Sequence, residues 1–192
     1  MSAIFLSASV PINGRGTYHE TANPFLIQCA VRDFAISVIR DHTIIWGGHP
    51  AITPMLWNIC EDLGGECAGK VVLYQSKIFA GIFPDENEFF PNIVYIDAVG
   101  EDQDQSVHAL REQMISRQDL AAAVFIGGME GIEIEHDMFK SYHPTATVLP
   151  VASPGGASLN LARDHGYFSG EQLTDIDFPR LYHTHLSNIH GV

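Results

Sequence analysis

Short apolar runs that alternate with segments of helical periodicity limit the fold of this sequence more than any other feature. Continuous apolar runs are typical of strands that are buried on both faces of a sheet. Strands that alternate with helices predict a parallel sheet. We therefore predict an α/β, doubly wound fold with a mainly parallel sheet of about six strands and helices on both faces. The predicted strands are residues 3–8, 43–46, 71–74, 93–96, 121–126 and 147–151.

The segments between these runs carry apolar residues at helical spacing. Pro54 fits the first turn of one such helix, and Gly64-Gly65 follows its end. Residues 75–92 lack a regular pattern and contain an acidic run, so we predict a long loop or lid there. The predicted helices are residues 24–40, 53–63, 105–117, 131–142, 153–163 and 178–189.

Length and charge restrict the domain organisation and the partners. The 192 residues fit one domain, with a ligand-binding domain over residues 1–168 and a helical tail of the same domain over residues 169–192. A formal net charge of −13 argues against nucleic acid or an anionic membrane as the main partner. No apolar run approaches the roughly 20 residues of a membrane span, the N-terminus lacks a signal-peptide pattern, and three cysteines fit a reduced chain. We expect a cytoplasmic protein.

Four of the predicted strands are followed by glycine or other small residues. In a doubly wound sheet these ends lie along one edge, where such sheets bind ligands. Small residues let a ligand approach the backbone closely, so we predict a ligand-binding cleft at this edge. Neither G-x-x-x-x-G-K-[ST] nor G-x-G-x-x-G is present, which argues against ordinary NTPases and dinucleotide oxidoreductases. The four ends are Ser7-Ala8-Ser9, Gly47-Gly48-His49-Pro50, Gly127-Gly128 and Ser153-Pro154-Gly155-Gly156.

The turn at residues 127–131 follows an apolar strand and opens a helix, so it can offer backbone N–H groups and a helix dipole to a phosphate. Arg15 and Tyr18 could hold a phosphate and a base, or be a solvated arginine and a tyrosine packed on the rim. His49 could contact the ligand or pack in its loop, and the serines could bind the ligand or cap strand ends. The predicted ligand-binding residues are Ser7, Ser9, Arg15, Tyr18, Gly47, Gly48, His49, Gly127, Gly128, Met129, Glu130, Gly131, Ser153 and Gly155.

These motifs resemble the SMF/DprA–LOG (SLOG) superfamily. Gly127-Gly128-x-x-Gly131 followed by Glu135 is similar to the G-G-x-G-T-x-x-E signature of that superfamily, and the other strand ends match the same spread of motifs. The resemblance covers most of residues 3–163 and is closest to SLOG sensor domains. It implies a Rossmann-like fold and a nucleotide or nucleotide-derived ligand.

The resemblance implies two functional branches. LOG-type enzymes hydrolyse the N-glycosidic bond of nucleoside monophosphates, whereas sensor domains tied to bacterial antiphage systems bind NAD-derived or related nucleotide signals. In the enzymes' pattern Glu135 and Arg111 would be catalytic, with Glu135 orienting the ribose or stabilising a developing oxocarbenium ion. The alternative for Glu135 is a favourable charge near a helix N-terminus. This sequence departs from the enzymes' pattern, since Met129-Glu130 stand in place of one residue and Ile132 stands where the enzymes keep a threonine.

We therefore predict a sensor of a nucleotide, NAD-derived or cyclic nucleotide signal, with antiphage defence as its implied setting. The alternative is an N-glycosidase acting on a nucleoside 5′-monophosphate or an NAD-related substrate, so enzymatic activity stays open. A regulatory subunit with a vestigial cleft is a third hypothesis. We expect a homo-oligomer, a separate effector protein, and no cofactor or metal. His183, His185 and His190 lack a carboxylate or cysteine at ligand spacing and fit a polar tail or a subunit contact.

Overall fold

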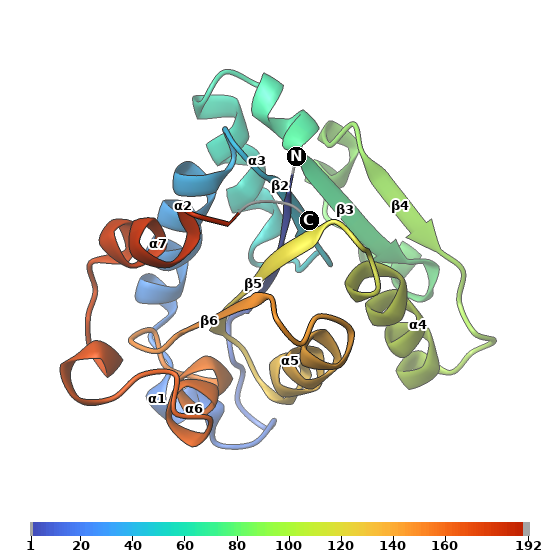
Figure 1. The fold of residues 1–192 in the computed structure, drawn as a ribbon. Helices are drawn as coiled ribbons and strands as arrows, with labels where there is room; N and C mark the ends of the chain where they lie inside the picture. Colours follow the sequence, from blue (N-terminus) through green and yellow to red (C-terminus); the bar gives the residue numbers. More distant parts are fainter. Residues whose placement is uncertain (1, 190–192) are drawn as a thin grey trace.

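A six-stranded sheet forms the centre of the computed structural model, which describes residues 2–189 (Figure 1). The strand order is β4-β3-β2-β1-β5-β6, and every neighbouring pair is parallel. The predicted doubly wound α/β fold is therefore confirmed, and the sheet is parallel throughout. The strands are β1 Ala3–Ser9, β2 Thr43–Trp46, β3 Val71–Ser76, β4 Ile93–Ile96, β5 Leu120–Gly127 and β6 Thr147–Val151.

Helices cover both faces of this sheet, as Figure 1 shows. The helices α2, α3 and α7 pack on one face, α4 and α5 pack on the other, and α6 contributes to both core layers. Within residues 2–189, none of the helices is both long and apolar enough to cross a bilayer. The α-helices are α1 Tyr18–Thr21, α2 Pro24–Val38, α3 Thr53–Asp62, α4 Gln103–Ile115, α5 Glu130–Tyr142, α6 Ala157–Asp164 and α7 Phe178–Leu186. The 3-10 helices are η1 Glu66–Lys70, η2 Lys77–Ile82, η3 Asp85–Phe89 and η4 Gly170–Leu173.

Alternate side chains of the central strand enter the two core layers. Leu6 of β1 belongs to the layer beneath α2 and α3, and its neighbour Phe5 belongs to the layer beneath α4 and α5. Burial on both faces explains why the strand runs are apolar without alternation. The tail joins this core, because Tyr182 of α7 packs edge-on against Phe34 of α2 and its hydroxyl donates to the Ala30 carbonyl at 2.8 Å.

The ends of two helices differ from the sequence prediction for local reasons. The α4 helix begins earlier than expected, because the Asp102 carboxylate caps it by accepting the Gln105 N–H at 2.9 Å. The α6 helix begins later than expected. The preceding Gly155 and Gly156 have φ values of +79° and +70°, which lie outside helical geometry.

The segment after β3 is more regular than the predicted loop. Residues 75 and 76 continue β3, and η2 and η3 account for most of the remainder. Contacts between aromatic rings hold this segment in place. The ring centroids of Phe89 and Trp57 of α3 are 4.9 Å apart, and those of Phe83 and Tyr95 of β4 are 5.9 Å apart. The segment is therefore packed against its neighbours.

The order of the strands places a switch point between β1 and β5. From β1 the chain builds the sheet outward to β4, then returns to add β5 and β6 on the other side of β1. Connections that leave two adjacent strands toward opposite faces create a crevice at the carboxyl edge of the sheet. The predicted strand ends consequently lie along this one edge.

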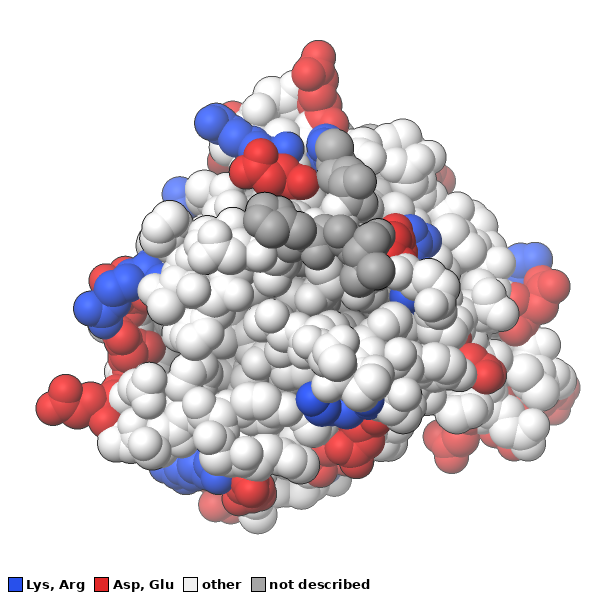
Figure 2. All heavy atoms as spheres, in the orientation of Figure 1, with Lys and Arg blue, Asp and Glu red and all other residues white. Residues whose placement is uncertain are grey.

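Charged side chains lie mainly around the periphery of the face drawn in Figure 2, and several basic groups there lie next to acidic ones. Among the ion pairs of the described residues, Lys77 pairs with Asp97 and Arg180 pairs with Asp175, each with an N–O separation of 2.5 Å. Exposed pairs of this kind are screened by water. The fold is therefore held by the two apolar core layers.

Candidate functional site

A cavity of about 680 Å³ opens at the carboxyl edge of the sheet, beside the switch point. Its walls come from the ends of β1 and β2, one side of α4, the start of α5, and the η2 segment. Ligand pockets commonly have volumes of about 300–1,000 Å³, so a nucleotide-sized molecule fits. The predicted site residues that line this cavity are Ser7, Ser9, Arg15, Gly47, Gly48, His49, Arg111, Met129, Glu130, Gly131 and Glu135.

Glu135 is held by two partners at the cavity wall. Arg111 Nε donates to Oε1 at 3.0 Å, and Ser7 Oγ donates to Oε2 at 2.5 Å. The Arg111 and Glu135 side chains are only 17% and 16% exposed. A Cβ at Gly131 would lie 2.7 Å from Arg111 Nη2, so the glycine makes room for the guanidinium. The network joins β1, α4 and α5 and fixes the position of the carboxylate.

A second arginine forms an ion pair with the first residue of α5. Arg15 donates from Nη2 to Glu130 Oε1, and both side chains are about half exposed. Partial burial opposes ionisation of Glu130, but the hydrogen bond from Arg15, its own backbone N–H and the nearby guanidinium charges hold its pKa below the ordinary value. An anionic ligand would therefore compete with Glu130 for Arg15.

The turn after β2 is fixed by Thr53, the first residue of α3. Thr53 Oγ1 accepts hydrogen bonds from Trp46 Nε1 at 3.1 Å and from the His49 N–H at 3.0 Å. His49 Nδ1 accepts the Ala51 N–H at 3.2 Å, so the proton of the neutral ring resides on Nε2. Burial lowers the pKa of His49. This ring therefore offers the cavity a neutral N–H donor at physiological pH.

Gly127 and Gly128 support the cavity without lining it. The Gly127 N–H donates to Ser158 Oγ at 2.9 Å, and the Gly128 N–H donates to the Ser9 carbonyl at 2.8 Å. Both glycines have positive φ, and a Cβ on Gly128 would lie 2.0 Å from the Ile132 side chain. Because their N–H groups have partners within the protein, a phosphate at this turn would meet the first turn of α5.

Three other predicted residues lie outside the cavity lining. The Tyr18 hydroxyl donates to Glu133 Oε1 at 3.1 Å, and burial, then the Glu133 charge, raise the pKa of Tyr18. Ser153 Oγ is buried and has no hydrogen-bond partner among the described residues. A Cβ at Gly155 would lie 2.0 Å from the Thr21 carbonyl oxygen. Tyr18 therefore links the first turn of α1 to α5, and Gly155 lets the end of α1 approach the segment before α6.

Several residues that line the cavity were not among the predicted site residues. Phe79 and Phe83 come from the segment that is predicted as a long loop or lid, and its irregular pattern gives no signal for either ring. Gln75 lies at the end of β3, beside Gly48. His108 precedes Arg111 by three residues on α4, and residues at this spacing share a helix face. That spacing is a sequence signal that could have identified His108.

Comparison with known proteins gives a family match over most of the chain. The family described as the SLOG cluster3 family matches residues 17–186. No curated protein matches the chain. The matched range includes Arg111, Glu135 and the start of α5, whereas Ser7, Ser9 and Arg15 precede it.

Proposed function

Because the chain belongs to the SLOG cluster3 family, we propose that it binds a nucleotide or nucleotide-derived signal in the cavity at the carboxyl edge of the sheet. The observation that carries the proposal is the presence of Arg15, Arg111 and the first turn of α5 in one cavity lining. Guanidinium groups and helix N-termini commonly bind phosphate. The volume of the cavity is consistent with a ligand of this size.

Another part of the lining suits a base or another flat apolar group. Phe79, Ile82 and Phe83 contribute apolar surface from the η2 segment, and aromatic side chains stack on nucleobases. The Nε2–H of His49 and the buried amide of Gln75 supply polar groups for a ribose or a base edge. The lining thus combines the polar and apolar parts that a nucleotide requires.

The carboxylates in the lining restrict how an anion can bind. Arg111 is paired with Glu135 and Arg15 with Glu130, so a phosphate must share or displace a carboxylate. The Arg111 pair is buried and has a second support in Ser7, whereas the Arg15 pair is half exposed. Arg15 is therefore the arginine that turns from Glu130 to the ligand, while Arg111 stays in place.

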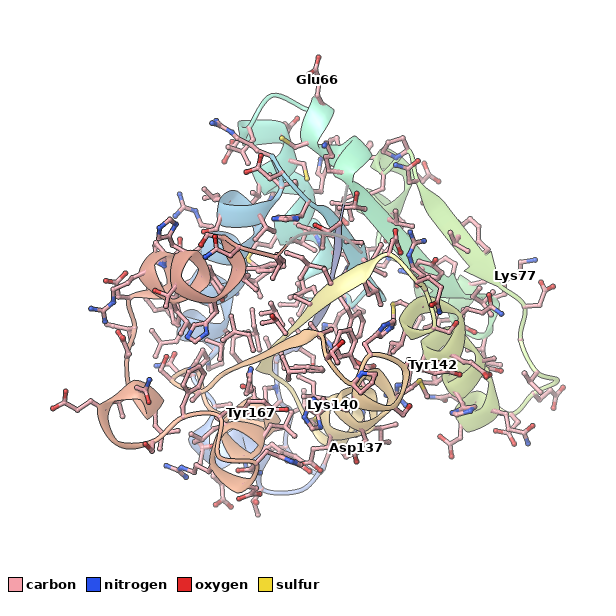
Figure 3. The ribbon with its side chains drawn as sticks, in the orientation of Figure 1. Glu66, Lys77, Asp137, Lys140, Tyr142 and Tyr167 are labelled. Atoms are coloured by element: carbon pink, nitrogen blue, oxygen red, sulfur yellow. The ribbon has the colours of Figure 1, made fainter. Side chains whose placement is uncertain are left out.

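Glu130→Gln is expected to tighten the binding of a phosphate-bearing nucleotide about two- to fivefold, because the change removes a competitor for Arg15 that is worth up to about 1 kcal/mol. Isothermal titration of both proteins with the same nucleotide measures this. Glu66→Gln makes the same charge change on η1, far from α5 (Figure 3). If both variants increase the nucleotide affinity equally, only the net charge of the protein matters. If Glu130→Gln binds the nucleotide more weakly than wild type, the proposed role of Arg15 is contradicted.

A ligand panel tests the proposed function directly. Purified protein is mixed with mono-, cyclic and ADP-ribose-type nucleotides and its melting temperature is recorded. A bound ligand at about 100 times its Kd stabilises the native state by about 2.7 kcal/mol. Arg15→Ala removes the arginine that turns to the ligand, so it should greatly reduce the shift at the same nucleotide concentration. If no nucleotide shifts the melting temperature of the wild-type protein, the vestigial-cleft hypothesis is favoured.

The second candidate function is hydrolysis of an N-glycosidic bond. It is favoured by the location of Glu135 in the cavity lining with both carboxylate oxygens positioned by Arg111 and Ser7. Such a carboxylate can stabilise positive charge developing on a ribose. Incubation with nucleoside 5′-monophosphates and NAD, followed by chromatography for free base, tests this. Base release that disappears in Glu135→Gln, a variant that keeps the side-chain shape, would replace the sensor proposal with the enzyme.

The setting of the sensor stays a prediction that rests on the resemblance. It comprises antiphage signalling in the cytoplasm, a homo-oligomeric state and a separate effector protein. Size-exclusion chromatography with light scattering, with and without the nucleotide that binds, measures whether the protein self-associates.

A further inference from the structure

Outside the cavity, three potential metal ligands meet at the junction of α5 and α6. His136, Asp137 and His165 each offer one ligand atom, and these atoms lie within 4.8 Å of one another. We propose that they bind Zn²⁺ or a similar late first-row divalent cation. Two imidazole nitrogens and one carboxylate oxygen are donors that such ions accept, with water as the fourth ligand.

The donor atoms lie close enough together that small side-chain shifts would bring them to the dimensions of a zinc site. His136 Nδ1 and Asp137 Oδ1 are 2.9 Å apart. Bonds of about 2.0–2.2 Å from one ion to both atoms subtend an angle of roughly 90°. His165 follows the last residue of α6 and is exposed, so its ring can adjust to complete the set. The hydrogen bond that joins His136 and Asp137 is replaced when the ion binds and the ligands lose their protons.

A second group holds the His136 ring in the orientation that a ligand needs. His136 is only 3% exposed, its Nε2 lies 2.9 Å from the Tyr167 hydroxyl, and its ring packs edge-on against Phe125. Metal-binding histidines usually hydrogen-bond through the other ring nitrogen, which fixes the tautomer. In the metal-free form Nδ1–H donates to Asp137. In the metal-bound form the ring proton lies on Nε2 and donates to the Tyr167 hydroxyl, which leaves the Nδ1 lone pair for the ion. Figure 3 shows Asp137 on α5 and Tyr167 on the segment after α6.

The charges around the site are mixed, because Arg163 in the last turn of α6 and Lys140 of α5 oppose a cation whereas a carboxylate and a helix dipole favour one. The Asp137 carboxylate lies next to the ring, and His165 caps α6, where the helix dipole is negative. Lys140, one turn along α5, opposes a cation, but its Nζ donates to the Pro144 carbonyl at 3.3 Å. None of the three ligands lines the nucleotide cavity. An ion here would tie α5 to the end of α6, which is a structural role.

Metal analysis of the purified 192-residue chain tests the site. Chelator-treated protein is dialysed against micromolar ZnCl₂ and its bound zinc is measured, and Co²⁺ is added to a second sample to record visible absorption. We expect one ion per chain and the intense absorption of tetrahedral Co²⁺. His165→Ala and Asp137→Asn remove exposed ligands and should each weaken binding at least tenfold. Tyr167→Phe keeps all three ligands and should weaken it about tenfold.

His183→Ala is the matched control, because His183 is an exposed histidine on α7. His185 lies on the same helix, and His190 lies outside the described residues. Circular dichroism checks that each variant is folded. The proposal is overturned if wild-type protein binds no stoichiometric zinc. It is overturned equally if His165→Ala and Asp137→Asn bind as tightly as wild type, or if His183→Ala alone loses the ion.

Discussion

Replacing Arg111 by methionine is expected to lower the free energy of unfolding by about 3 kcal/mol. The change leaves the Glu135 carboxylate, which is 16% exposed, with the Ser7 hydroxyl as its remaining hydrogen-bond partner in this network. Breaking a buried ion pair by removing one partner commonly costs about 3–5 kcal/mol, because the other charge stays in a low-dielectric site. Residual water contact places the expected value at the lower end. Urea unfolding monitored by circular dichroism measures it.

A second substitution separates the cost of leaving the Glu135 carboxylate unpaired from the cost of losing the packing of the Arg111 side chain. In the Arg111→Met background, Glu135→Gln replaces the carboxylate by a neutral amide, so it should restore about 1–2 kcal/mol of the loss. A double-mutant cycle gives the coupling between the two residues. If Arg111→Met costs less than about 0.5 kcal/mol, water reaches Glu135 freely and the buried network does not fix this carboxylate.

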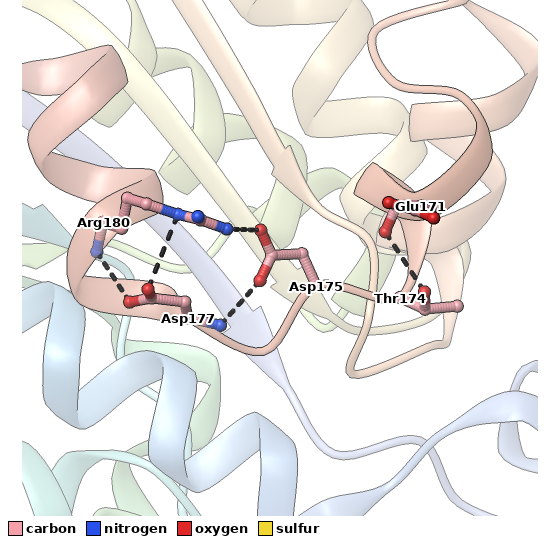
Figure 4. Close-up of polar contacts among 5 residues, drawn as sticks. All are labelled: Glu171, Thr174, Asp175, Asp177 and Arg180. Carbon is pink, nitrogen blue, oxygen red and sulfur yellow. Dashed lines mark hydrogen bonds and ion pairs between the residues drawn. The ribbon is translucent and has the colours of Figure 1, made fainter.

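Arg180→Met is the control for this experiment, because Arg180 also pairs with carboxylates but in an exposed position. Figure 4 shows Arg180 beside Asp175 and Asp177. The N–O separations are 2.5 Å to Asp175 and 3.5 Å to Asp177, and the Arg180 side chain is 66% exposed. Water and salt screen such a pair. The loss from Arg180→Met should therefore be much smaller than that from Arg111→Met. It should also shrink further in 1 M salt.

The sheet could be predicted from the sequence because its signals are local. Each strand is an apolar run bounded by turn residues, and even Pro150 within β6 fits, since β6 is an edge strand that pairs only with β5. The ends of the helices were harder to predict, because each end depends on a single capping side chain or on the backbone conformation of one or two residues. The Asp102 cap extended α4, and the positive φ at Gly155 and Gly156 delayed α6.

A cavity lies at the edge of the sheet where the sequence predicts the ligand site. The hydrogen-bond partners of the backbone groups at this edge could not be predicted. The pattern at residues 127–131 indicates a phosphate turn. However, the Gly127 N–H binds Ser158, which lies 31 residues further along the chain, and sequence spacing does not reveal such a contact. The ion pair between Arg15 and Glu130 spans 115 residues. Residue type therefore indicated which groups could bind a ligand, whereas tertiary structure determines which of them are available.

Gly155→Ala is expected to lower the free energy of unfolding by about 3 kcal/mol. A Cβ at this position would lie 2.0 Å from the Thr21 carbonyl oxygen, and φ is +79°. The positive φ costs about 1 kcal/mol for alanine, and overpacking against a rigid neighbour adds about 1–3 kcal/mol. Gly166→Ala is the matched control, because φ is +68° there and nothing lies within 4 Å of its Cβ. It should cost only about 1 kcal/mol.

The same pair of variants tests how the first loop reaches the cavity. The Gly156 N–H donates to Thr21 Oγ1 at 3.1 Å, and the Asn23 N–H donates to the Pro154 carbonyl at 2.8 Å. These bonds hold α1, and with it the loop that carries Arg15, against the start of α6. Displacing Thr21 should therefore weaken nucleotide binding in Gly155→Ala but not in Gly166→Ala. Equal affinities, measured by titration at a temperature where both variants are folded, would show that Arg15 is positioned independently of this contact.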